Sequence, residues 1–150
     1  MTFQSHPQAE QRRRSIANLI KVVLANKGPD ILEKHIRDAL GTLLWKMSEV
    51  DGKYKTRYQS AGALKCKDKS QLRHDHVYPR SKLIDSLLTA RPEEVDEILK
   101  RALGCTVTAE EHLRLCRFDK DHIGWDRYRR ASVSVMDTMT GEPELSADSD

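Results

Sequence analysis

Several features that would assign this chain to a familiar class are missing from its sequence. No apolar run is long enough to cross a bilayer, so we expect no membrane-spanning helix and no membrane partner. The opening residues, MTFQSHPQAEQRRR, contain no signal-peptide core. Cys66, Cys105 and Cys116 are odd in number and form no C-x-x-C pair, which argues against a structural zinc site. These absences predict a cytoplasmic protein with reduced thiols.

Charge is abundant but unevenly distributed. The chain carries a formal net charge of +3, and residues 141–150 hold four acidic residues and no basic one, which leaves +7 on residues 1–140. Residues 51–70, DGKYKTRYQSAGALKCKDKS, contain six Lys or Arg residues and two Tyr residues. A basic surface interleaved with aromatic rings favours an anionic partner, of which nucleic acid is the commonest. A solvated connection between domains is an equally good interpretation of this segment.

The length predicts one domain, or one domain with an extension, and the pattern of residues predicts an α+β fold that is mostly helical. We expect an N-terminal helical hairpin over residues 1–50 and a basic linker or loop over 51–70, with a short helix near 60–64. A small ββα-like unit with a helical insertion follows over 71–139. Residues 140–150 form an acidic tail that we expect to be disordered.

Apolar spacings of three and four define the hairpin. They predict a first helix over 8–26 and a second that ends near Met47, for which Asp30 and Glu33 form a capping box. Leu19 is expected on the apolar face of the first helix and Leu32 on that of the second. Trp45 is expected in the core. The two helices can pack within the chain or across a homodimer, and periodicity does not distinguish these arrangements.

The remaining elements follow from proline, glycine and capping signals. They are a strand over 71–78 ended by Pro79, a helix over 81–90 capped by Ser81, and a helix from Pro92 to Leu103. A β-prone stretch over 105–107 follows, with a helix from Ala109 begun by a capping box of Thr108 and Glu111. A helix over 125–131 and a strand over 133–136 complete the list. Trp125 and Tyr128 are expected in the core, with Arg127, Arg129 and Arg130 partly solvated.

The strand over 71–78 carries three ionisable residues in a row, within LRHDHVYPRSKL. His74, Asp75 and His76 lie between apolar flanks, and a buried imidazole or carboxylate is costly unless something partners it. The partner can be a nearby arginine, a metal ion or a nucleic acid. Three such groups on a half-buried strand favour a site of some kind.

Two stretches resemble a known motif. DHVYPRS is similar to the first half of the ββα-metal, or HNH, nuclease motif, and VTAEEHLRL is similar to its second half. The resemblance implies that Asp75 and His112 hold a divalent ion, Mg, Mn or Zn, while His76 activates water, with His74 as the alternative base or a flanking partner. The family's middle Asn, which would fall near Leu103 or Gly104, is absent. Another alignment makes His112 the middle residue and His122 the last.

Two functions from different classes follow. The first is a metal-dependent endonuclease of HNH type that hydrolyses DNA phosphodiester bonds. The second is a non-catalytic accessory or inhibitory protein, of the kind mobile elements carry, which binds nucleic acid or protein through a degenerate HNH-like fold. In either case we expect the nucleic acid to meet Lys53, Tyr54, Lys55, Arg57, Tyr58, Lys65, Lys67, Arg80, Arg129 and Arg130.

Overall fold

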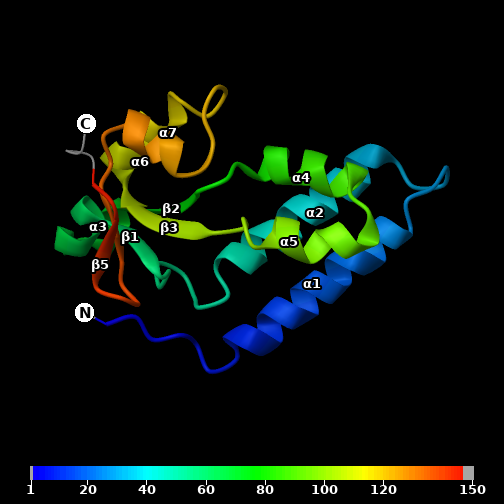
Figure 1. Ribbon diagram of the computed structural model, residues 1–150, viewed down its shortest axis with the longest axis horizontal. Coiled ribbons are helices and arrows are strands. Elements are labelled where there is room, and N and C mark those ends of the chain that lie inside the picture. Colours follow the sequence, from blue (N-terminus) through cyan, green and yellow to red (C-terminus); the bar gives the residue numbers. More distant parts are fainter. Residues whose placement is uncertain (1, 147–150) are drawn as a thin grey trace.

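A computed structural model of the chain describes residues 2–146 and confirms the α+β, mostly helical class (Figure 1). The helices are α1 (Ala9–Ala25), α2 (Glu33–Ser48), α3 (Ala61–Lys65), α4 (Arg80–Thr89), α5 (Val95–Leu99), α6 (Ala109–Cys116) and α7 (Gly124–Arg130). The strands are β1 (Tyr58–Ser60), β2 (Leu72–His76), β3 (Gly104–Thr108), β4 (Val135–Asp137) and β5 (Glu142–Leu145). Within residues 2–146, no helix is both long and apolar enough to traverse a membrane.

The molecule has a helical half and a sheet half, joined by the long β2 and β3 segments (Figure 1). In the helical half, α1 and α2 form the predicted hairpin, and α4 and α5 pack against it. Its core contains Ile20, Leu40, Leu44 and Leu87, all almost fully buried. The helical insertion between β2 and β3 therefore shares one core with the N-terminal helices.

Four local predictions in the helical half are wrong. Helix α2 begins at Glu33 with Leu32 as its N-cap and no side-chain cap, because the backbone of Leu32 accepts the first helical bonds and Asp30 lies two residues too early. Helix α4 begins at Arg80 behind Pro79, so Ser81 is inside the helix. The helix from Pro92 opens as a short 3-10 turn, Pro92–Glu94, and α5 ends at Leu99.

Three residues predicted on apolar faces or in the core are more exposed than expected. Leu19 and Leu32 are exposed, at 49% and 65% of their surface, since the α1–α2 hairpin buries only part of each apolar stripe. Trp45 is only half-buried, because it faces β2 and α4 at the edge of the helical core.

The sheet half is built on five strands in the order β2-β3-β1-β4-β5. Strand β1 lies at the centre, parallel to β3 and antiparallel to β4, although the composition of residues 51–70 predicts a linker. The predicted short helix in this segment is α3, whose N-cap Ser60 accepts a bond from the Ala63 amide. Strand β5 pairs with β4, so the prediction of disorder from Thr140 is wrong for Glu142–Leu145, and residues 147–150 lie outside the described residues.

The order strand, strand, helix appears as expected in β2, β3 and α6. Strands β2 and β3 are antiparallel, and α6 follows β3 without a loop. Thr108 caps α6 as predicted, since its hydroxyl accepts a hydrogen bond from the Glu111 amide at 3.2 Å and donates to the Glu111 carboxylate at 3.1 Å. The cap fixes where the helix begins and so places His112 in its first turn, beside β2.

Candidate functional site

Strand β2 carries the candidate residues on its two opposite faces. Successive side chains of a strand point to opposite sides, so Asp75 faces one way and His74 and His76 face the other. The contacts confirm this: Asp75 meets α6 and α7, whereas both histidines meet α2. Asp75 and His112 are therefore brought together as expected, and His76 lies across the sheet from them.

On the α6 and α7 face, the carboxylate of Asp75 has three partners. Its Oδ2 accepts hydrogen bonds from the Arg127 guanidinium and from the Tyr128 hydroxyl, and its Oδ1 lies 3.4 Å from Nδ1 of His112. Arg127 also donates to the backbone oxygen of His76 at 2.7 Å and to Asp119 at 2.7 Å. This group, in which Asp75, Arg127 and Tyr128 are buried and His112 is half-buried, is called the carboxylate cluster.

Burial and the contacts that oppose it set the protonation states of the carboxylate cluster. It would raise the pKa of Asp75 on its own, but contact with His112, the charge of Arg127 and the Tyr128 hydroxyl together lower that pKa. Burial also raises the pKa of Tyr128 well above its ordinary value. Asp75 is therefore ionised and Tyr128 protonated at neutral pH, the states in which the hydroxyl donates to the carboxylate.

Arg127 and Tyr128 are site residues that the motif does not include. The sequence predicts a partly solvated Arg127, but its side chain is only 2% exposed because it reaches inward to a carboxylate 52 residues earlier. A signal is present in GWDRYRR. Gly124, Arg127 and Tyr128, spaced by three and four, form the buried stripe of α7, and a charge on such a stripe needs an opposite charge.

On the α2 face, two imidazoles pack around Trp45. The ring of Trp45 lies 5.3 Å from that of His74 and 4.8 Å from that of His76, and the Arg80 guanidinium covers Trp45 at 4.9 Å. Nε2 of His74 lies 2.8 Å from the Ser48 hydroxyl. This group, Trp45, His74, His76 and Arg80, is called the imidazole cluster below.

The imidazole cluster contains ring nitrogens without a protein partner. Within residues 2–146, Nδ1 of His74 and Nε2 of His76 are buried and make no hydrogen bond. Burial, together with the nearby His74 and Arg80, lowers the pKa of His76 to about 3. Burial also lowers the pKa of His74, against the opposing charges of Glu49 and Asp75. Both rings are therefore neutral at physiological pH.

The residues present give poor support for a divalent ion. Among residues 2–146 no group of three or more His, Cys, Asp and Glu side chains is placed to hold a metal. Asp75 and His112 supply one free donor each, but Arg127 already places a positive charge against Asp75. A second cation there would be repelled. The metal ion stays a prediction.

The alternative alignment, with His122 as the last motif residue, does not bring the motif residues together either. His122 lies in the loop before α7, where its Nδ1 is 2.7 Å from Asp126 and its ring packs on Phe118. The pair spans one helical turn at the surface. His122 and His112 thus have different acidic partners, Asp126 and Asp75.

The residues expected to grip nucleic acid divide into two groups. Lys53, Lys55, Lys65 and Lys67 are exposed, and no ion pair is found for any of them within residues 2–146. Others already have partners. Arg57 makes two bonds to Asp137 at 2.8 and 2.6 Å, Tyr58 packs on Trp125 at 5.1 Å, and Arg80 donates to the Gly41 backbone. Arg129 and Arg130 are exposed, with Asp126 3.7 and 4.0 Å away.

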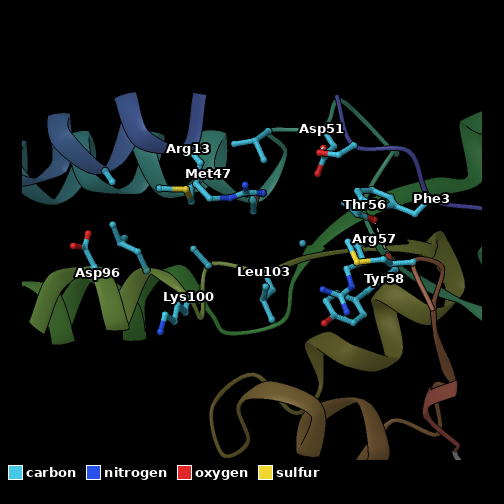
Figure 2. Close-up of a pocket in the computed structure, with 18 residues that line it drawn as sticks. Phe3, Arg13, Met47, Asp51, Thr56, Arg57, Tyr58, Asp96, Lys100 and Leu103 are labelled. Carbon is cyan, nitrogen blue, oxygen red and sulfur yellow. Dashed lines mark hydrogen bonds between the residues drawn. The ribbon is translucent and has the colours of Figure 1, made fainter. Parts of the chain in front are cut away.

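A cavity of about 450 Å³ lies between the helical and sheet halves. Figure 2 shows it with Arg13 and Met47 on one side, Asp96 of α5 and the following Lys100 across from them, and Thr56 at the far end. Its lining mixes Asp51 and Asp96 with cations that have acidic partners, such as Lys100 with Glu97 at 2.8 Å. This mixture does not select an anion.

Comparison with known proteins adds no identity. No protein-family model, no curated protein and no solved structure matches the chain.

Proposed function

We propose that this protein binds nucleic acid and that its HNH-like ββα unit is a scaffold, not a metal-dependent hydrolase. The proposal that the ββα unit is not a hydrolase rests on the placement of the expected catalytic groups. The expected base, His76, lies on the α2 face of β2, while Asp75 and His112 lie on the α6 and α7 face. A base must come within hydrogen-bond reach of the water it activates, and here the sheet separates His76 from the expected metal ligands, Asp75 and His112.

The carboxylate cluster supports the same conclusion. Oδ2 of Asp75 is used twice, by Arg127 and Tyr128, and the guanidinium supplies the positive charge that a buried carboxylate requires. Arg127 also ties α7 to the His76 backbone at the edge of the sheet. Asp75 thereby fastens two helices to β2, which is a structural role.

The nucleic-acid half of the proposal rests on charge. Residues 51–70 hold six basic and two acidic residues, a net charge of +4 on a segment that includes the central strand and α3. Its exposed lysines have no acidic partners among the described residues, so they can neutralise phosphates and release counterions. We further propose a cytoplasmic setting, in which Cys66, Cys105 and Cys116 remain the free thiols found here.

The catalytic half is tested by incubating the protein with supercoiled plasmid and Mg or Mn, beside a His76→Ala variant. We expect no nicking with either protein. Nicking by the wild type that His76→Ala abolishes would overturn the scaffold proposal and establish the endonuclease.

The binding half is tested by titrating labelled DNA at several salt concentrations. We expect affinity to fall steeply with salt, and the double variant Lys65→Gln/Lys67→Gln to reduce the salt slope by roughly two, since each phosphate contact contributes about one. The matched control is Lys34→Gln/Lys82→Gln, which removes two exposed lysines from the helical half. An equal effect of both pairs, or no binding at all, would contradict the proposed interface.

A further inference from the structure

We propose that a groove beside Tyr54 is a binding site for single-stranded nucleic acid, in which a base stacks on Tyr54 and the adjoining phosphates meet Lys53 and Lys55. The inference rests on the proposed function and adds the form of nucleic acid and the place where it binds. The groove has a volume of about 620 Å³, and its lining includes Phe3, Gln4, Tyr54, Lys55, Gln59 and Thr138.

The composition of this groove differs from that of the cavity between the halves. No acidic residue lines it, whereas Asp51 and Asp96 line the cavity. Two aromatic residues, Phe3 and Tyr54, line it together with Lys55, which has no acidic partner within residues 2–146. Aromatic faces with nearby cations are the recurring composition of surfaces that bind single strands.

Charge and ring coincide at Tyr54. The ammonium of Lys53 lies 5.1 Å from the centroid of the Tyr54 ring, so a base stacked at this ring would lie close to a cation able to meet its phosphate. The backbone of Tyr54 adopts φ +58°, a left-handed conformation that is uncommon for a residue with a bulky side chain. A strained aromatic residue on a basic surface is most simply explained by what its ring does there.

The groove can also contact base edges. The side-chain nitrogen of Gln59 donates to the Thr56 backbone at 3.3 Å, which fixes the side chain. Within residues 2–146 its amide oxygen takes part in no hydrogen bond, so it can accept one from a base. Gln4 is exposed and also lines the groove. Amide side chains can accept from and donate to the exposed edge of an unpaired base, an edge that a duplex occupies with its own pairing.

Hydrogen bonds within the protein hold the walls of the groove in place. The Phe3 amide donates to the Thr138 backbone at 3.0 Å, which fastens the N-terminal segment beside β4. The Thr56 hydroxyl lies 2.7 Å from that of Thr106 on β3, and the Lys55 amide donates to Gly52 at 3.2 Å. The groove therefore exists before a strand enters it, which reduces the entropy lost on binding.

The test measures fluorescence anisotropy of a labelled single-stranded DNA oligonucleotide, and of the same sequence as a duplex, with wild type and Tyr54→Gly. Glycine adopts positive φ without strain, so this variant removes the ring while retaining the backbone conformation, and its melting temperature should not fall. We expect single-strand affinity to fall roughly five- to a hundredfold, as loss of one stacked base predicts. The control Lys34→Gln should bind as wild type does.

The outcomes separate the two proposals. Single-strand binding that Tyr54→Gly leaves unchanged would overturn the groove and leave nucleic-acid binding by the lysines intact. Preferential binding of the duplex would do the same. Absence of binding to either DNA would overturn the proposed function itself. A selective loss of single-strand affinity in a variant as stable as wild type would establish the groove.

Discussion

The two faces of strand β2 use similar residues in opposite ways. On the α6 and α7 face, a buried charge is surrounded by donors, and Asp75 is bound by Arg127 and Tyr128. On the α2 face, two imidazoles are packed against Trp45 with one nitrogen of each left without a bond among the described residues. The matched charges and hydrogen bonds around Asp75 stabilise the packing of α6 and α7 on β2. The packing of His74 and His76 against Trp45, in contrast, is stable only while both rings are neutral. The two faces of β2 therefore differ because the neighbouring helices offer different partners to its side chains.

The largest effect should come from separating the buried ion pair. In Arg127→Ala, Asp75 is left as a buried carboxylate without its cation, and we expect a loss of about 3–5 kcal/mol in the free energy of unfolding. Urea denaturation at pH 7.5 measures this. The control is Arg129→Ala, in the same helix. The Arg129 side chain is 55% exposed, so its removal should change the free energy of unfolding by less than about 0.5 kcal/mol.

The same measurement tests whether matched charges explain the stability of the α6 and α7 face. A loss below about 1 kcal/mol for Arg127→Ala would mean that Asp75 does not need its cation. Adding Asp75→Asn should recover part of the loss, because the uncompensated charge is then removed. If the double variant were less stable than Arg127→Ala alone, charge matching would not explain this face.

A smaller effect is expected where the α2 face is tightest. A Cβ at Gly104 would lie 2.5 Å from Cε1 of His74 and 2.6 Å from the backbone oxygen of Ser48, and the backbone cannot move aside cheaply. Gly104→Ala should therefore cost about 1–3 kcal/mol by overpacking. Gly28→Ala, where a Cβ would have nothing within 4 Å, is the control. Thermal or urea unfolding of both variants would show whether the imidazole cluster tolerates displacement.

The last effect is a dependence of stability on pH. In the unfolded chain His76 titrates near its ordinary 6.5, and in the fold its pKa is about 3, so acid favours the unfolded state. The contribution is complete above pH 6.5 and is lost as pH falls toward 3, at up to about 1.4 kcal/mol per pH unit. Asp75, whose pKa is lowered from 3.8, acts only in stronger acid.

Denaturation at pH 7.5, 6 and 5 should therefore show stability falling with acidity in the wild type. His76→Phe retains an aromatic ring against Trp45 and should flatten this dependence, with His74 accounting for what remains. The exposed His35→Gln is the control and should leave the profile as it is. An unchanged slope in His76→Phe would show that the imidazole cluster does not control acid sensitivity.

Much of the fold could be predicted from local signals. Helical spacing predicts the α1–α2 hairpin, and the Thr108 capping box places the start of α6 and with it His112. Strand β1 could not be predicted because it has three residues and depends on β3 and β4, which lie far along the chain. A strand that short has no usable alternation of its own, so its neighbours determine it.

The site could be predicted only in part for a similar reason. The residues LRHDHVYP indicate that Asp75 needs a partner, and the motif brings His112 to it, but nothing local joins Asp75 to Arg127. Period-two alternation in β2 does place Asp75 and His76 on different faces. That rule, applied to the motif residues alone, is enough to separate the expected base from the expected metal ligand.

The position of β1 has a consequence for how the chain folds. Its two neighbours arrive late: β3 begins at Gly104 and β4 at Val135, and Arg57 bonds to Asp137 across 80 residues. Closing loops of this size costs entropy before any pairing compensates, and such distant contacts slow folding. During synthesis the α1–α2 hairpin can form from near neighbours, whereas β1 has its first strand partner only when β3 has been made and its second only when β4 has been made. Assembly of the sheet is therefore the late step, and the surface proposed to bind nucleic acid is completed with it.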